Sequence, residues 1–115
     1  MELRITESAG YTNVTVTGEL TYEDVRKFVD SLDTLLESRD VLDILLDIQA
    51  VPYVTSRGLG AIVSTYTVLS RRGGRLVVVC PNEDVLASFS VTKLDRILQI
   101  VATRAEGETL LSAAS

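Results

Sequence analysis

Two apolar runs of strand length flank an amphipathic stretch in the middle of the chain, and this order restricts the fold more than any other feature. Residues 41–48 and 76–80 are nearly continuous apolar runs, typical of strands that are covered on both faces. Between them, apolar residues recur at helical spacing from about Ser56 to Arg72. A strand, a helix and a strand joined by short links favour two parallel strands connected by a right-handed crossover.

Weaker patterns extend this central unit toward both ends of the chain. Residues 3–6 and 12–17 alternate apolar and polar side chains on either side of a glycine turn, which predicts an antiparallel pair of strands. A helix of about four turns is expected after Thr21, with Asp24 as the acidic member of a capping box. The remaining predictions are a short helix capped by Asn82, a sheet edge covered by Leu94 and Ile97, a strand at 98–102 and a helix at 108–113.

Length and composition indicate one globular domain, which we place at residues 1–115. Of these residues 46% are apolar and 23% charged, as in ordinary folded proteins. The net charge of −5 argues against a nucleic-acid or anionic-membrane partner, since both attract positively charged surfaces. No signal sequence or membrane-spanning run is visible, and the single Cys80 cannot form an internal disulfide. We therefore expect a cytoplasmic protein with no direct membrane insertion and with a buried, reduced thiol.

Few residues of the chain are suited to catalysis or to metal binding. The sequence has no histidine and one cysteine, which removes the commonest general base and argues against a zinc site. Asp43 and Asp47 fall on one face of a predicted strand, either as strand-end residues with local hydrogen bonds or, several times less favoured, as an acid–base pair. The arginines and glycines of residues 71–75 are typical of a helix end. We expect no enzymatic activity, no metal and no cofactor.

The junction at residues 53–61 carries most of the functional information. It places Thr55 and Ser56 where the first apolar run gives way to the amphipathic helix. Hydroxyls at a helix start cap backbone N–H groups, and the same N–H groups with the helix dipole favour an added phosphate. Gly58 and Gly60 each cost the helix about 1 kcal/mol relative to alanine. Because they have no side chain, they either let a partner approach closely beside the hydroxyls or allow the helix to pack closely on the sheet.

Two segments resemble the STAS domain, in particular the bacterial anti-sigma factor antagonists. They are Gly18-Glu-Leu-Thr21 and Val54-Thr-Ser-Arg-Gly-Leu-Gly60, and the order of the elements agrees over essentially the whole chain. The resemblance implies an α/β fold with a small mixed sheet, an N-terminal antiparallel pair and helices packed mainly on one face. It also implies partner switching. The unmodified domain binds an anti-sigma factor, often itself a serine kinase, and phosphorylation of a serine at a helix start ends that complex and so regulates transcription.

Applied to this chain, the resemblance makes Ser56 the phosphorylated residue, with Thr55 as the alternative acceptor. The family usually has an aspartate immediately before that serine and a small residue after it, where this chain has Thr55 and Arg57. Arg57 could pair with a phosphate on Ser56. The predicted partner-binding residues are Thr21, Tyr22, Val54, Thr55, Ser56, Arg57, Gly58 and Ala61.

The partners that the resemblance implies are an anti-sigma factor with serine kinase activity and, for the reverse reaction, a phosphatase. A homodimer is left open. The missing aspartate favours an alternative in which the domain does not switch and serves as a scaffold subunit of a signalling assembly or of a membrane transporter's machinery. An enzyme is a remote third option, because no catalytic constellation is visible.

Overall fold

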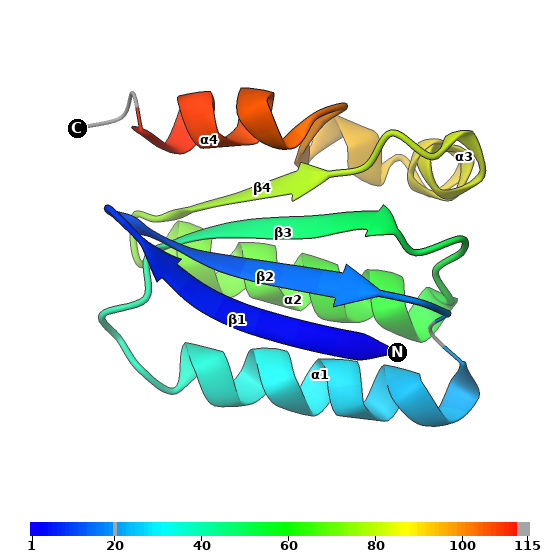
Figure 1. Ribbon diagram of the computed structural model, residues 1–115, viewed down its shortest axis with the longest axis horizontal. Coiled ribbons are helices and arrows are strands. Elements are labelled where there is room, and N and C mark those ends of the chain that lie inside the picture. The colour runs from blue at the N-terminus through cyan, green and yellow to red at the C-terminus, as the bar shows by residue number, and fades with distance from the viewer. Residues whose placement is uncertain (20, 113–115) are drawn as a thin grey trace.

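A five-stranded mixed sheet forms the centre of the computed structural model, which describes residues 1–19 and 21–112 and, for Tyr22, the backbone alone. The strands follow one another across the sheet in chain order (Figure 1). β1 (Glu2–Ser8) is antiparallel to β2 (Tyr11–Thr17), and each later strand is parallel to the one before it. The later strands are β3 (Asp43–Ala50), β4 (Arg75–Val79) and β5 (Gln99–Val101).

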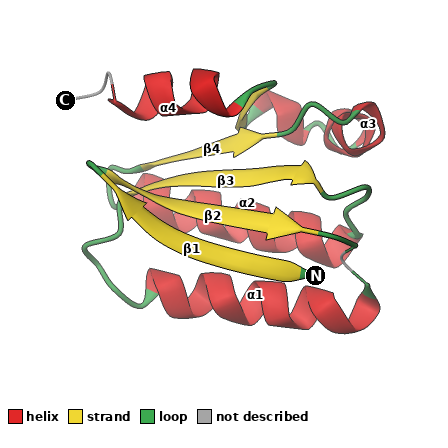
Figure 2. Ribbon diagram, viewed as in Figure 1, coloured by secondary structure: helices red, strands yellow, loops and turns green. Residues whose placement is uncertain are grey.

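Helices cover both faces of the sheet, but unequally (Figure 2). Within the described residues the α-helices are α1 (Tyr22–Leu36), α2 (Ser56–Arg71), α3 (Glu83–Val91) and α4 (Arg104–Ser112), and a 3₁₀ turn, η1 (Leu94–Arg96), precedes β5. α1 and α2 pack on one face, whereas α4 lies on the other. None of the helices in the described part of the chain has both the length and the apolar character needed to span a bilayer.

β3 is buried on both faces and separates two apolar clusters. Ile44, Leu46 and Ile48 belong to the larger cluster, which includes side chains of α1, α2 and α3. Leu45 points the other way and joins a smaller cluster with Leu111 of α4. This burial explains why the strand has an almost uninterrupted apolar sequence. The predicted mixed sheet, with most helices on one face, is confirmed.

Several helix termini are built as the sequence predicts. Thr21 caps α1, since its hydroxyl accepts the backbone N–H of Asp24 at 3.3 Å, and Asn82 caps α3. After the end of α2, Gly73 adopts a φ of +79°, a conformation that glycine allows without strain. The Arg72 guanidinium donates to three backbone carbonyls at and just after the end of α1. Residues 71–75 therefore end α2 and, through Arg72, attach it to the end of α1.

The start of α4 was predicted four residues too late. The helix begins at Arg104, and the residue before it, Thr103, bonds to Glu106 in a Thr-X-X-Glu pattern that was not among the predicted helix starts. The Thr103 hydroxyl accepts the backbone N–H of Glu106 at 3.2 Å and donates to its carboxylate at 3.1 Å. The predicted last residue of this helix, Ala113, lies outside the described residues.

Smaller differences affect β3 and the segment before β5. β3 begins at Asp43, two residues later than predicted. Leu94 is half-buried against the larger core, as expected. Ile97 is 52% exposed and lines a hollow beside the start of β5, so it is less buried than a residue expected to cover the sheet edge.

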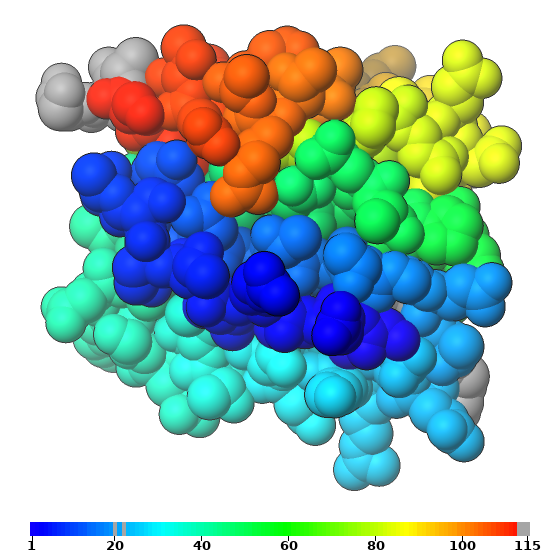
Figure 3. Space-filling view, in the orientation of Figure 1, coloured from blue at the N-terminus to red at the C-terminus, as the bar shows by residue number. Residues whose placement is uncertain are grey.

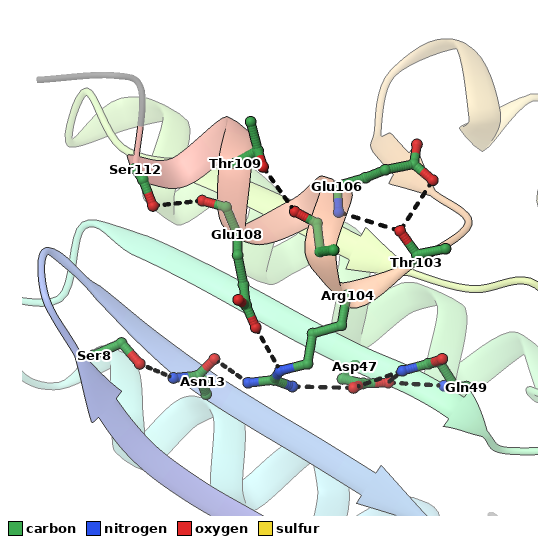
Figure 4. A network of polar contacts seen from close by, with 11 residues as sticks. Ser8, Asn13, Asp47, Gln49, Thr103, Arg104, Glu106, Glu108, Thr109 and Ser112 are labelled. Atoms are coloured by element: carbon green, nitrogen blue, oxygen red, sulfur yellow. Dashed lines mark hydrogen bonds and ion pairs between the residues drawn. The ribbon is translucent and has the colours of Figure 1, made fainter.

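A polar network fastens α4 to the sheet (Figure 4). The Arg104 guanidinium pairs with the carboxylates of Asp47 and Glu108, both at 3.0 Å, and donates to the side-chain carbonyl of Asn13. Asp47 and Asn13 are buried, at 6% and 3% exposure. The Gln49 side chain also donates to Asp47, at 2.9 Å. The buried carboxylate is thus paired and hydrogen-bonded, as a charge removed from water must be.

Replacing Arg104 with methionine is expected to lower the free energy of unfolding by about 3 kcal/mol, because the buried carboxylate of Asp47 would lose its cationic partner. Glu108→Gln removes the other ion pair of the same arginine, but Glu108 has a side chain 45% exposed. This control should cost less than about 1 kcal/mol. Urea unfolding of both variants measures the difference. Equal losses would show that burial of Asp47 does not determine the strength of the network.

Two glycine-to-alanine changes should have opposite effects on stability. A Cβ at Gly74 would lie 1.8 Å from the carbonyl oxygen of Leu42, a backbone atom that cannot turn aside. Gly74→Ala should therefore cost about 2 kcal/mol or more. A Cβ at Gly60 meets nothing within 4 Å, so Gly60→Ala should stabilise α2 by about 0.5–1 kcal/mol. Thermal unfolding of the two variants checks both signs, and a neutral Gly74→Ala would contradict the close approach.

Candidate functional site

The loop between β3 and α2 is held in place by two buried valines. Val51 is fully buried and donates its backbone N–H to the carbonyl of Ile48 at 3.0 Å. Val54 is 8% exposed. Thr55 then adopts an extended backbone, and its hydroxyl accepts the backbone N–H of Gly58 at 3.2 Å. The loop is therefore anchored by apolar contacts, and its last residue is the cap of α2.

The two hydroxyls at this junction have different environments. Thr55 is half-buried, and its side chain is used as the helix cap. Ser56 is the first residue of α2, is exposed, and makes no side-chain hydrogen bond to any described residue. Arg57, the next residue, is also exposed. Of the two candidate acceptors, Ser56 is therefore the one that a second protein can reach without disturbing the cap.

The first turn of α2 carries no acidic residue. α1 and α3, in contrast, each begin with two, which are Glu23 and Asp24 in α1 and Glu83 and Asp84 in α3. Acidic side chains in the first turn offset the partial positive charge of a helix N-terminus. At α2 this charge is not offset from within the first turn, and Arg57 adds a further positive charge. An added negative charge would be stabilised there.

The two glycines of α2 have different roles. Gly58 is buried, and a Cβ there would lie 2.8 Å from a methyl group of Val54 and 3.5 Å from one of Val25. Gly58 thus lets α2 approach its own loop and the start of α1. Gly60 is exposed and has open space where a Cβ would be. The packing interpretation therefore applies to Gly58, and the open surface lies at Gly60.

The loop before α1 lies at the same end of the sheet as Ser56. α1 and α2 follow the carboxyl ends of the parallel strands β2 and β3, and both helices begin at the right-hand side of Figure 1. The two segments predicted to form one docking face are therefore neighbours.

The Thr21 hydroxyl donates to the carboxylate of Asp24 at 3.0 Å, and this bond lowers the pKa of Asp24.

The predicted partner-binding residues are not equally accessible. Thr21, Ser56 and Arg57 are exposed, Thr55 and Ala61 are half-buried, Val54 and Gly58 are buried, and the side chain of Tyr22 lies outside the described part. Tyr53 is not among the predicted partner-binding residues, although it is 45% exposed and lies three residues before Ser56. The sequence could have indicated this exposure. Val51 and Val54 are apolar and buried, and the residues between them, Pro52 and Tyr53, are exposed.

The other chemical candidates form ordinary structural contacts. Asp43 pairs with Arg75 at 2.9 Å, and Asp47 pairs with Arg104, so each carboxylate has its own cation. Both carboxylates therefore make structural contacts, but the ion pairs join segments far apart in the chain, and only the bonds from Gln49 to Asp47, of those in the described part of the chain, are local. Cys80 is a buried free thiol, as predicted, and burial raises its pKa, which keeps it protonated. Among the described residues no cluster of histidine, cysteine, aspartate and glutamate could hold a metal ion.

Comparison with known proteins agrees with this architecture. An anti-sigma F factor antagonist of Paenibacillus polymyxa is 23% identical over 115 residues, which cover 100% of this chain and 98% of that protein. A protein of Thermotoga neapolitana, provisionally named as an anti-sigma factor antagonist, is 41% identical over 63 residues, or 55% of this chain and 56% of that protein. The second alignment thus spans little more than half of either protein.

A solved structure and a family model extend the comparison to most of the chain. The crystal structure of an anti-sigma factor antagonist from Mycobacterium paratuberculosis superposes with a TM-score of 0.87 at 20% identity, covering 96% of this chain and 93% of that one. At that identity the likeness establishes the fold alone. The STAS domain model matches residues 1–107, a span that includes every strand of the sheet and the whole of α2. The chain therefore belongs to the STAS domain family.

Proposed function

We propose that this protein is an anti-sigma factor antagonist that regulates transcription by partner switching. It binds an anti-sigma factor with serine kinase activity through the surface at the start of α2, and phosphorylation of Ser56 ends that complex. The names of the relatives support the antagonist role. The observation that carries the proposal is the exposure of Ser56 as the first residue of α2, at the end of the sheet where α1 also begins.

Ser56 is a better acceptor than Thr55 for a structural reason. The Thr55 hydroxyl is half-buried and bonded to the backbone N–H of Gly58, so a kinase would have to break this cap, which contributes about 1 kcal/mol, to reach it. A phosphate on Ser56 leaves this bond in place. It also brings a negative charge to a helix start that has no acidic residue in its first turn.

The charge of the phosphate is sufficient to explain release without a change of shape. Phosphorylation adds about −1.5 to −2 charge to a surface whose exposed members include Tyr53, Ser56 and Gly60. Burying that charge without a partner would cost several kcal/mol, and each 1.4 kcal/mol is about a tenfold change in the dissociation constant. Arg57 lies beside the phosphate and offsets part of its charge.

In this proposal the protein acts in the cytoplasm, catalyses no reaction itself and needs no cofactor, while a phosphatase restores the unmodified form. Thr55 takes the place of the aspartate usual in the family, and this difference favours a second candidate function. In that case the domain is a non-switching scaffold subunit of a signalling assembly or of a transporter's machinery. The binding experiment below separates the two.

Binding to the anti-sigma factor partner of this protein should depend on charge at position 56. Ser56→Ala should bind as the wild type does, whereas Ser56→Asp should bind at least about tenfold more weakly, since it places a carboxylate in the contact surface. Ser70→Asp is the matched control. It lies on the same helix, is exposed, and is about 21 Å further along the axis, so it should leave affinity unchanged.

Titration calorimetry measures these affinities, and mass spectrometry after incubation with the same protein and ATP locates the phosphate. Modification at Ser56 alone is the expected result. Equal binding by the wild type, Ser56→Ala and Ser56→Asp would reject the switch and support the scaffold function.

Loss of binding by Ser56→Asp should not come from loss of stability. A carboxylate in the first turn of α2 should raise the free energy of unfolding by about 0.3–1 kcal/mol at low ionic strength. Ser64→Asp, at an exposed position in the middle of the same helix, should give no gain. Urea unfolding at low salt and at about 0.5 M salt tests this, because screening should remove the gain. A destabilised Ser56→Asp would contradict a positive potential at this helix start.

A further inference from the structure

The two edge strands of the sheet differ in the number of charged side chains that disfavour pairing with a strand of another chain. β1 forms one edge and carries Glu2, Arg4 and Glu7, charges that disfavour pairing with another strand. In the space-filling view β1 lies uncovered across the front of the molecule (Figure 3). β5 forms the other edge, and its three residues, Gln99–Val101, carry no charge. The outer backbone groups of β5 therefore have no charged side chain on their own strand to discourage a partner.

A groove lined by both apolar and polar side chains follows β5. It consists of two hollows of about 440 and 550 Å³, which share Gln99 and Leu110 as lining residues. Ile97 lines the first hollow and is 52% exposed, and Leu110 lines both and is 39% exposed. Because a strand of three residues offers few backbone groups for pairing, the exposed side chains of Ile97 and Leu110 beside this uncharged edge are what indicate a surface that another chain covers.

The ends of this groove carry opposite charges. Arg96 lines the hollow at the start of β5, and Glu106 lines the hollow at its end. Arg75 also lines the first hollow, but it already pairs with Asp43 and donates to two backbone carbonyls of α4. A strand of this length spans about 10 Å. Antiparallel pairing of two such strands brings the start of each beside the end of the other.

We propose that a second copy of this chain docks on the β5 edge with its own β5 antiparallel, so that Arg96 of each copy faces Glu106 of the other. A two-fold axis makes both charge contacts at once, and the exposed side chains of Ile97 and Leu110 fill the space between them. Pairing also continues the sheet from one copy into the next. The inference is independent of the switch, because β5 lies at the outer edge of the sheet and Ser56 opens the helix that joins β3 to β4.

Sedimentation velocity of the isolated chain tests the proposal directly. The dimer should be detected as concentration rises from about 5 to 500 μM, the range expected for a small, symmetric edge contact. Ser56→Asp should dimerise like the wild type, so that loss of the switch and loss of the dimer are measured separately. A monomer at every concentration would overturn the proposal.

Two exposed isoleucines on opposite edges provide a matched pair of variants. Ile97→Glu should raise the dimer dissociation constant by at least about tenfold, because it removes an apolar side chain from the contact and puts a carboxylate in its place. Ile5→Glu, on β1, should leave it unchanged, although Ile5 is 41% exposed. Circular dichroism confirms that both variants are folded. If Ile5→Glu weakens the dimer and Ile97→Glu does not, the contact lies on the β1 edge and the proposal is wrong.

Charge reversal tests the predicted pairing of Arg96 with Glu106. Arg96→Glu and Glu106→Arg should each weaken self-association by about three- to tenfold. Mixing the two single variants should restore it, since the heterodimer regains both opposite-charge contacts. The double variant should also dimerise like the wild type. If mixing does not restore association, the antiparallel arrangement is excluded.

Discussion

Burial of β3 on both faces is the constraint on which the rest of the structure depends. Ile44, Leu46 and Ile48 require cover on one side and Leu45 requires it on the other, so helices must pack on both faces of the sheet. The crossover through α2 provides part of that cover, together with α1, and brings the chain back parallel in β4. The chain therefore leaves β3 at the carboxyl edge of the sheet and must start a helix there.

That helix start separates structural and functional roles along a few consecutive residues. Val54 and Gly58 face inward and fix the loop against α1, while Thr55 satisfies an otherwise unpaired backbone N–H. Ser56 carries none of these tasks and is exposed. A residue in this position can gain a charged group without loss of packing or of the cap, which is what a reversible covalent signal requires.

The second face of the sheet is held differently from the first. Under α1 and α2 the contacts are almost entirely apolar. α4 is a shorter helix that buries few apolar side chains, and its position depends in addition on the ion pair between Arg104 and the buried Asp47. Such a pair stabilises one arrangement of α4 because any shift would leave a buried charge uncompensated. In this arrangement α4 leaves a hollow between itself and the β5 edge open to contact.

The sequence by itself determined the order of the elements, the parallel core, the caps at Thr21, Thr55 and Asn82, and the family. These features follow from local periodicity, from side chains that bond to the backbone a few residues away, and from a short motif. The start of α4 was equally local, but the Thr-X-X-Glu pattern at Thr103 was not among the predicted helix starts.

Only the tertiary structure decided which residues lie at the surface and which distant residues meet. Asp43 and Asp47 look alike in sequence, yet each pairs with an arginine from a different segment, 32 and 57 residues further along the chain. Gly58 packs and Gly60 does not, because only one of them faces Val54 and Val25. Tyr53 and Ile97 are exposed although they are large and apolar, since exposure depends on what the folded chain places over a residue and not on the residue itself.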